Sequence, residues 1–124
     1  MSSVFTKIIE GQIPCYKIYE DDHSIAFLDI NPETPGHTLV VPKNEVDKIY
    51  DLPEEDYINL MLATKKVATH MEKVFGRRTI WEVIGVDVPH AHIHLKPFDE
   101  TWTPGRHIAM TEAEFIAMRD KLAF

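Results

Sequence analysis

Hydrophobic and polar positions along the chain fall into blocks that predict a short helix, several strands, a long helix and a closing helix. Apolar residues recur at helical spacing from Val4 to Ile9, and Gly11 ends that run. Segments rich in β-branched and aromatic residues follow, separated by polar turns and by a loop dense in Pro and Gly. The strands are expected at residues 16–19, 25–28, 37–41, 77–83 and 90–97.

The strongest local pattern predicts a long helix in the middle of the chain. Apolar residues repeat at i, i+3 and i+4 from Tyr57 to Phe75, which amounts to about five helical turns. Asp51, followed three residues later by Glu54, is expected to cap its start. Gly76 is expected to end it, because glycine readily adopts the left-handed conformation that terminates helices.

The closing helix is expected to open with Thr111 and Glu114, a capping pattern, and to pack Phe115 and Leu122 inward. Strands and helices come in blocks and do not alternate strictly. That order favours an α+β fold with an antiparallel sheet, one long central helix, and short helices at either end. At 124 residues the chain, 1–124, is expected to form one domain.

Composition narrows the class of protein. Hydrophobic residues make up 44% and charged residues 27%, which excludes a disordered chain. Twenty acidic residues against 13 basic ones give a net charge of −7, so a dedicated nucleic-acid binder with a basic face is not expected. A nucleotide substrate is not excluded, because it needs only one local site.

Cysteine content and apolar run length indicate the compartment. Cys15 is the one cysteine, so no disulfide within the chain is expected. The first residues lack the pattern of a signal peptide, and apolar runs are far shorter than the roughly 20 residues that span a bilayer. We therefore expect a soluble, cytoplasmic protein that does not associate with membranes.

Three of the seven histidines lie in one tract at alternating positions. Residues i, i+2 and i+4 of a strand share a face, so His90, His92 and His94 are expected on one side together with Lys96. The intervening apolar residues are expected to face the core. They are Ala91, Ile93 and Leu95.

Two chemical interpretations compete with the plain one that a strand happens to hold histidines. A metal ion binds His-x-His pairs in some enzymes, but alternate side chains stand about 7 Å apart, so one ion cannot easily collect all three. Phosphate chemistry uses the whole tract, because one imidazole can attack phosphorus while its neighbours donate hydrogen bonds to the oxygens. Lys96 could then add a cation for a distal phosphate.

The tract at residues 90–96 resembles the His-x-His-x-His-x-x motif of the histidine triad family of nucleotide hydrolases and transferases. Residues 5–14 resemble the opening helix of that family, and residues 26–43 resemble its most recognisable other stretch. The three segments occur in the family's order.

The resemblance implies roles for individual residues. His92 is expected to be the nucleophile that forms a nucleotidyl-histidine intermediate with an α-phosphate. His94 and His37 are expected to contact that phosphate or the leaving group, and His90 to support the ring arrangement. Asp29 matches the acid that accepts hydrogen bonds from the ribose hydroxyls.

The resemblance also implies a substrate class and an assembly. Phe5, Ile8 and Ile30 match the apolar walls of a base pocket, so the expected ligand is a purine nucleotide, with no cofactor required. The expected activity is hydrolysis of nucleoside phosphoramidates. Dinucleoside polyphosphate hydrolysis and a non-catalytic nucleotide-binding module that regulates a partner remain the alternatives. The family fold pairs into a homodimer.

The sequence departs from the family pattern at three places. Lys96 stands where the motif usually has an aliphatic residue, and Asp87 stands in a segment that often carries a side-chain amide. Both are expected to contact the nucleotide, and Asp87 would repel a phosphate that it faces. Ser3, Thr6 and Glu45 occupy positions where many relatives bind a structural zinc, so no metal is expected.

Overall fold

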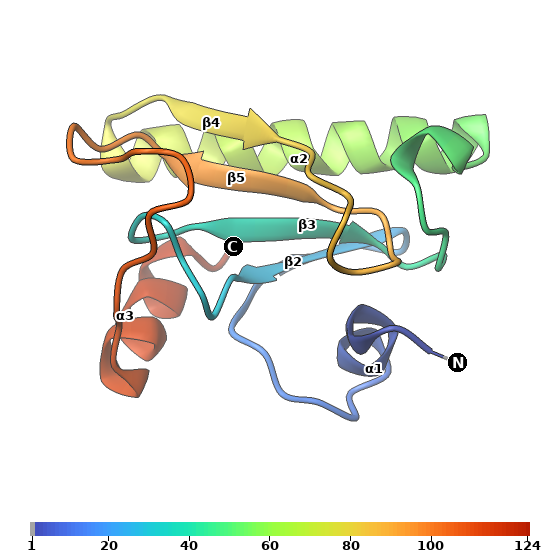
Figure 1. Ribbon diagram of the computed structural model, residues 1–124, viewed down its shortest axis with the longest axis horizontal. Coiled ribbons are helices and arrows are strands. Elements are labelled where there is room, and N and C mark those ends of the chain that lie inside the picture. Colours follow the sequence, from blue (N-terminus) through green and yellow to red (C-terminus); the bar gives the residue numbers. More distant parts are fainter. Residues whose placement is uncertain (1) are drawn as a thin grey trace.

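A five-stranded antiparallel sheet lies at the centre of the fold, in the strand order β1-β2-β3-β5-β4 (Figure 1). The computed structural model describes residues 2–124. The strands are β1 (Lys17–Glu20), β2 (Ser24–Leu28), β3 (Thr38–Pro42), β4 (Thr79–Glu82) and β5 (Ile93–Pro97). The helices are α1 (Val4–Ile9), the 3₁₀ turn η1 (Ile49–Asp51), α2 (Glu54–Phe75) and α3 (Glu112–Leu122). The predicted α+β class with an antiparallel sheet is confirmed.

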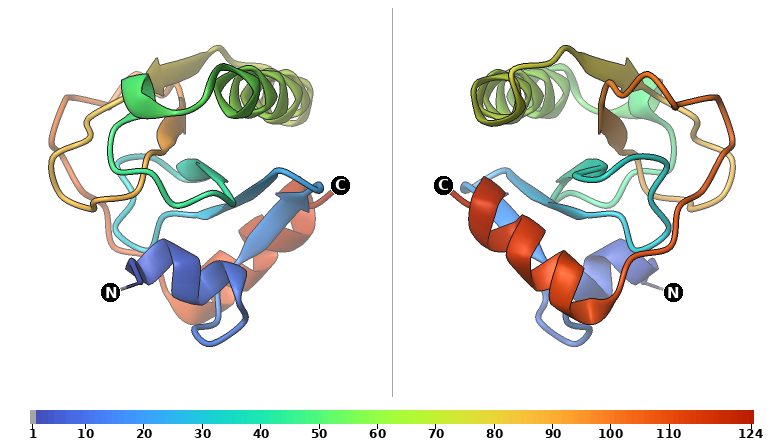
Figure 2. Two further views of the ribbon diagram at one scale, coloured as in Figure 1. Left: turned by 90° about the vertical axis from the view of Figure 1, so that its right-hand side faces the viewer. Right: turned by 90° about the vertical axis from the view of Figure 1, so that its left-hand side faces the viewer.

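Each face of the sheet is covered by helix, as the two side views in Figure 2 show. On β2, Ala26 and Leu28 pack toward α2, while Ile25 and Phe27 pack toward α1 on the opposite face. The alternation follows from the two-residue period of a strand. Helix α3 packs against β1 and α2. No helix within residues 2–124 combines the length and apolar character that crossing a bilayer requires.

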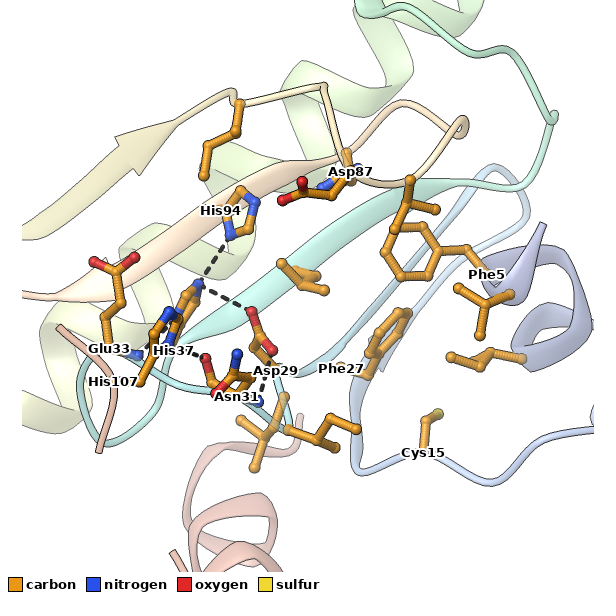
Figure 3. Close-up of a pocket in the computed structure, with 18 of the residues that line it drawn as sticks. Phe5, Cys15, Phe27, Asp29, Asn31, Glu33, His37, Asp87, His94 and His107 are labelled. Carbon is orange, nitrogen blue, oxygen red and sulfur yellow. Dashed lines mark hydrogen bonds and ion pairs between the residues drawn. The ribbon is translucent and has the colours of Figure 1, made fainter. Parts of the chain in front are cut away.

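Strand β5, between β3 and β4, alternates as predicted but is shorter than the expected 90–97. Ile93 and Leu95 belong to the core under α2, whereas His94 projects toward the α1 face (Figure 3). Lys96, two residues further along the strand, shares the face of His94. Pairing with β3 begins only at Ile93, opposite Val40. His90 and His92 therefore precede the strand, in a segment that ends the long connection from β4.

The helix ends test the local predictions. The capping box of Thr111 and Glu114 at the start of α3 is confirmed. Gly76 ends α2 in the left-handed conformation, as expected. The predicted Asp51 cap is wrong, because Pro53 occupies the cap position of α2 and Asp51 closes the preceding 3₁₀ turn. A proline there presets the backbone angle without any side-chain hydrogen bond.

Candidate active site

A cavity of about 610 Å³ opens on the α1 face of the sheet, beside the ends of β2, β3 and β5 (Figure 3). Apolar side chains from α1 and β2 form one end, and histidines and carboxylates form the other. Its size and mixed lining suit a ligand with an apolar part and a charged part. Eight of the predicted site residues line it: Phe5, Ile8, Asp29, Ile30, His37, Asp87, His92 and His94.

The other two predicted residues are buried outside the cavity lining. His90 is fully buried between the start of α1 and the last residue of β3. Lys96 is 1% exposed and pairs with two glutamates, Glu33 and Glu82. An ammonium group held in this way is not directed at a ligand in the cavity.

His92 presents an unprotonated nitrogen to the cavity. Its Nδ1 lies 2.7 Å from the carbonyl oxygen of His90, which can only accept, so the Nδ1 proton is donated there. Nε2 of the neutral ring is then left with a free lone pair. The edge of the Phe5 ring packs against the imidazole at a centroid distance of 5.0 Å and helps fix its orientation. This ring has the form that a nucleophile requires.

His37 and His94 form a relay with the opposite polarity, drawn as dashed lines in Figure 3. The backbone N–H of Glu33 donates to His37 Nδ1 at 3.0 Å, so the proton of neutral His37 resides on Nε2. That Nε2–H donates to His94 Nδ1 at 2.9 Å. The proton of His94 is therefore on Nε2, where it faces the cavity as a donor.

Burial keeps both rings of this relay neutral. Desolvation lowers the pKa of His37 to about 3, with the charges of His94 and Lys96 acting in the same direction. Desolvation likewise lowers the pKa of His94 to about 4, helped by His92 and Lys96. Near neutral pH the relay thus offers an uncharged donor whose proton position is set by a backbone amide.

A polar cluster joins His90 to the N-terminal helix. Ser3 Oγ lies 2.7 Å from His90 Nδ1, and His90 Nε2 lies 2.7 Å from the carbonyl oxygen of Pro42. The carboxylate of Glu45 accepts from the Ser3 backbone N–H and from the Thr6 hydroxyl. The cluster thus connects α1 to His90, whose backbone carbonyl orients His92. It is formed by the three residues at the positions where many relatives are expected to bind zinc, namely Ser3, Thr6 and Glu45.

Asp29 lies at the edge of the cavity beside the relay. Its Oδ1 accepts the backbone N–H of Asn31 at 2.9 Å, and its Oδ2 lies 3.5 Å from His37 Nε2. Burial raises the pKa of this carboxyl, and the hydrogen bond from Asn31 partly offsets the rise. One oxygen therefore remains free to accept from a hydroxyl-bearing ligand.

Asp29, His37 and His94 also have the composition of a metal site, since one ligand atom from each lies within 4.8 Å of the others. The hydrogen-bond directions do not fit that use. A metal needs the lone pair of His37 Nε2, but the Glu33 amide occupies the Nδ1 lone pair and leaves the proton on Nε2. The metal-free site therefore remains our prediction.

Glu33 and His107 line the cavity although neither is among the predicted site residues. Glu33 lines the cavity and supplies the amide that orients His37. His107 lines it from the loop before α3, with Nδ1 2.9 Å from the carbonyl oxygen of Asn31. Neither belongs to a spacing pattern, because each reaches the site through loop packing between distant segments.

The described lining residues carry four carboxylates and no lysine or arginine. The acidic side chains are Asp29, Glu33, Glu82 and Asp87. A highly charged anion therefore meets no lysine or arginine among these lining residues, whereas a single phosphate can accept the Nε2–H of His94.

Comparisons with known proteins agree with this geometry. The HIT domain model matches residues 10–101. The chain is 40% identical over 99 residues to an uncharacterized HIT-like protein of Methanocaldococcus jannaschii, covering 76% of this chain and 77% of that one. It is 37% identical over 99 residues to an adenosine 5'-monophosphoramidase of Schizosaccharomyces pombe, covering 78% and 74%.

Solved structures give the same answer for the whole fold. A HIT-like protein from Bartonella henselae superposes with a TM-score of 0.87 at 30% identity, covering 98% of this chain and 93% of that one. The match extends over nearly the whole of both chains. The chain belongs to the HIT, or histidine triad, family.

Proposed function

We propose that the protein hydrolyses purine nucleoside phosphoramidates at the α-phosphate through a covalent intermediate on His92. The observation that carries the proposal is the opposite hydrogen-bonding polarity of His92 and His94, two rings that line one cavity. His92 presents a lone pair and His94 presents an N–H. A nucleophile beside a fixed donor is the arrangement that phosphoryl transfer needs.

The reaction proceeds in two displacements. His92 Nε2 attacks the α-phosphorus, the P–N bond breaks, and the departing nitrogen keeps the electron pair and takes a proton from solvent. His94 Nε2–H stabilises the negative charge that develops on a non-bridging oxygen. Water then attacks phosphorus, loses a proton to solvent, and releases the nucleoside monophosphate with the lone pair returned to His92.

The ligand orientation follows from the two ends of the cavity. The base occupies the apolar end beside Phe5, Ile8 and Ile30, and the ribose hydroxyls reach the free oxygen of Asp29. The phosphate then lies between His92 and His94. This placement gives the phosphate the Nε2–H of His94 as a donor and gives the ribose the carboxylate of Asp29 as an acceptor.

The charges of the cavity favour a phosphoramidate over a dinucleoside polyphosphate. Lys96 was expected to supply a cation for a distal phosphate, but that ammonium is paired with Glu33 and Glu82. Asp87 lines the cavity and would repel a second phosphate. The yeast relatives named adenosine 5'-monophosphoramidases, including one of Saccharomyces cerevisiae at 35% identity, support the same choice.

The proposal is tested by intact-mass measurement after brief mixing with adenosine 5'-phosphoramidate. The wild-type protein is expected to gain the mass of one adenylyl group, and His92→Ala is expected to form no adduct while still binding AMP. His23→Ala, in the turn between β1 and β2, is the matched control. Unchanged turnover in His92→Ala would end the proposal, and nucleotide binding without any adduct would favour a non-catalytic module.

A second copy of the chain is the proposed partner, docked along β4. This strand is one of the two edges of the sheet, and an unpaired edge is a ready site for pairing. Exposed apolar side chains surround it on β4, on the following loop and on α2. They are Trp81, Val83, Ile84, Tyr57 and Leu62.

Sedimentation velocity tests the dimer. The wild-type chain is expected to sediment as a dimer, and Trp81→Lys is expected to shift it toward monomer by placing a charge at the centre of this face. A monomeric wild type would contradict the proposed assembly.

A further inference from the structure

A buried ion-pair cluster lies beside the relay and has no part in the reaction described above. Lys96 Nζ is 3.0 Å from Glu33 Oε1 and also pairs with Glu82 of the neighbouring strand. Lys96 is 1% and Glu33 8% exposed, whereas Glu82 is 39% exposed. The Lys96–Glu33 contact is therefore the desolvated part of the cluster, and such a pair is costly to break.

Glu33 connects this ion pair to the histidines. Its carboxylate accepts from Lys96 and from the indole N–H of Trp102 at 2.9 Å. Its backbone N–H is the donor that places the proton of His37 on Nε2. The same residue thus joins a buried cation to the amide that sets the polarity of the His37–His94 relay.

The segment that carries this amide needs such an anchor. Residues 29–37 form a loop outside the sheet, between β2 and β3. Side-chain contacts from Lys96 and Trp102, and the backbone hydrogen bond from Ile108 to Pro32, tie the loop to the rest of the fold. Without Lys96, the carboxylate of Glu33 loses its cation, so it takes up a proton or turns toward water, and the loop loses one of its anchors.

We propose that Lys96 is a positioning residue: through its ion pair with Glu33 it holds the Glu33 amide in place, and so keeps His94 a neutral donor facing the cavity. The part of this inference that concerns turnover rests on the proposed function. The part that concerns the proton position on His94 does not.

The positive charge of Lys96 also favours the neutral form of His94, in addition to the positioning role of its ion pair. The charge of Lys96 helps keep the pKa of both His37 and His94 low, while the nearby glutamates oppose it. Replacing the ammonium by an apolar group removes that effect, so the pKa of both rings is expected to rise. The titratable groups around the relay are His92 and Lys96 beside His94, Asp29 beside His37, Glu82 on β4, Glu33 in the loop, and His107 before α3.

The test compares Lys96→Met with Lys43→Met, which removes the ammonium of a more exposed pair with Glu20 outside the active-site cavity. For Lys96→Met we expect kcat to fall roughly 10- to 100-fold, the loss typical when a partner that orients a functional histidine is removed. KM is expected to change little, the NMR titration of His94 to move to higher pH, and Lys43→Met to match the wild type. A Lys96→Met enzyme with unchanged kcat and an unchanged His94 titration, even if less stable, overturns the proposal.

A double variant guards against misfolding of the single one. Lys96→Met with Glu33→Gln removes both buried charges, keeps the amide and keeps an acceptor for Trp102. It is expected to recover most of the lost kcat. A double variant that stays as impaired as a folded Lys96→Met single variant would show that the pair does not act through Glu33.

Nitrogen-15 NMR of His94 separates this inference from the proposed function. The wild type is expected to show the Nε2–H form, and Lys96→Met a mixture of the two neutral forms, whether or not any phosphoramidate is turned over. An unchanged Nε2–H signal in Lys96→Met rejects the positioning role. Absence of turnover by the wild type rejects only the proposed function.

Discussion

Four histidines on this face of the sheet form two pairs, His90–His92 and His37–His94, which differ in the backbone group that bonds to a ring Nδ1. Nδ1 of His92 donates to a backbone carbonyl, so Nε2 of this ring carries the lone pair. Nδ1 of His37 accepts from a backbone amide, so Nε2 of His37 carries the proton and donates it to His94. One residue type thus supplies both a nucleophile and a donor because of the group behind each ring.

The two pairs also differ in how far their supports reach. His92 is oriented by the backbone of His90, two residues away. The His37–His94 relay depends on contacts across 57 positions of sequence and on a loop held by Lys96 and Trp102. We therefore expect the nucleophile to tolerate distant substitutions better than the donor does.

Removing the donor gives the largest expected effect. His94→Ala is expected to lower kcat roughly 100- to 1000-fold, because an oxyanion-type hydrogen bond is lost. Slow adduct formation on His92 should persist, and the Kd for AMP should stay within about twofold. Rapid-quench kinetics with calorimetry measures both. A kcat close to the wild-type value would place the donor elsewhere.

Acidification is expected to lower the stability of the fold through the two buried rings of the relay. Histidine in the unfolded chain binds a proton near its ordinary pKa of 6.5, whereas folded His94 binds one only near 4 and His37 near 3. The unfolded state therefore takes up more protons, and the free energy of unfolding falls as pH drops from 6.5 toward 4. Each group contributes about 1.4 kcal/mol per pH unit across its window.

Urea denaturation at a series of pH values measures this slope. His37→Gln is expected to have a shallower slope between pH 6.5 and 4 than the wild type, and His23→Gln the same slope. Equal slopes in His37→Gln and wild type would contradict the low pKa of His37.

Disturbing the support of His90 should have a smaller effect. Ser3 caps α1 through the backbone N–H of Thr6 and also contacts His90. Ser3→Ala is expected to lower the free energy of unfolding by about 1 kcal/mol, with Ser2→Ala as the exposed control. Because His92 is held by a backbone carbonyl, kcat should change less than in His94→Ala. A loss of kcat as large as that of His94→Ala would show that the N-terminal cluster acts on the nucleophile.

The apolar end of the cavity should give the smallest effect. Ile8 is half-buried and lines the predicted base pocket, so Ile8→Ala is expected to weaken AMP binding roughly threefold to tenfold through lost apolar contact. The half-buried Ile116 on α3 provides the control, Ile116→Ala. Calorimetry with AMP compares the two variants, and equal affinities for AMP would show that the base does not bind at the apolar end of the cavity.

Much of the fold was predictable because it depends on short-range patterns. The two-residue period of the strands placed Ile93 and Leu95 in the core, and helical spacing with Gly76 located α2 and its end. The Asp51 cap failed because a proline two residues later could begin the helix without a side-chain hydrogen bond. Local rules thus located the elements better than their boundaries.

The site was predictable in its residue types but not in its connections. The histidine tract identified His92 and His94, and the family resemblance added His37 and Asp29, all of which line the cavity. Lys96 shares the face of His94 as expected, but the sequence contains no sign that Glu33 would meet it from a loop 63 positions away. A pairing of that kind depends on how a loop packs, which periodicity does not describe.

The sequence by itself determined the elements, the faces on which their side chains lie, and the family to which the histidine motif points. Only the tertiary structure decided which nitrogen of each ring carries a proton and which charge Lys96 meets. The physical reason is that periodicity is a property of consecutive residues, whereas the direction of a hydrogen bond depends on the group opposite. For His37 and His94, those groups come from other segments of the chain.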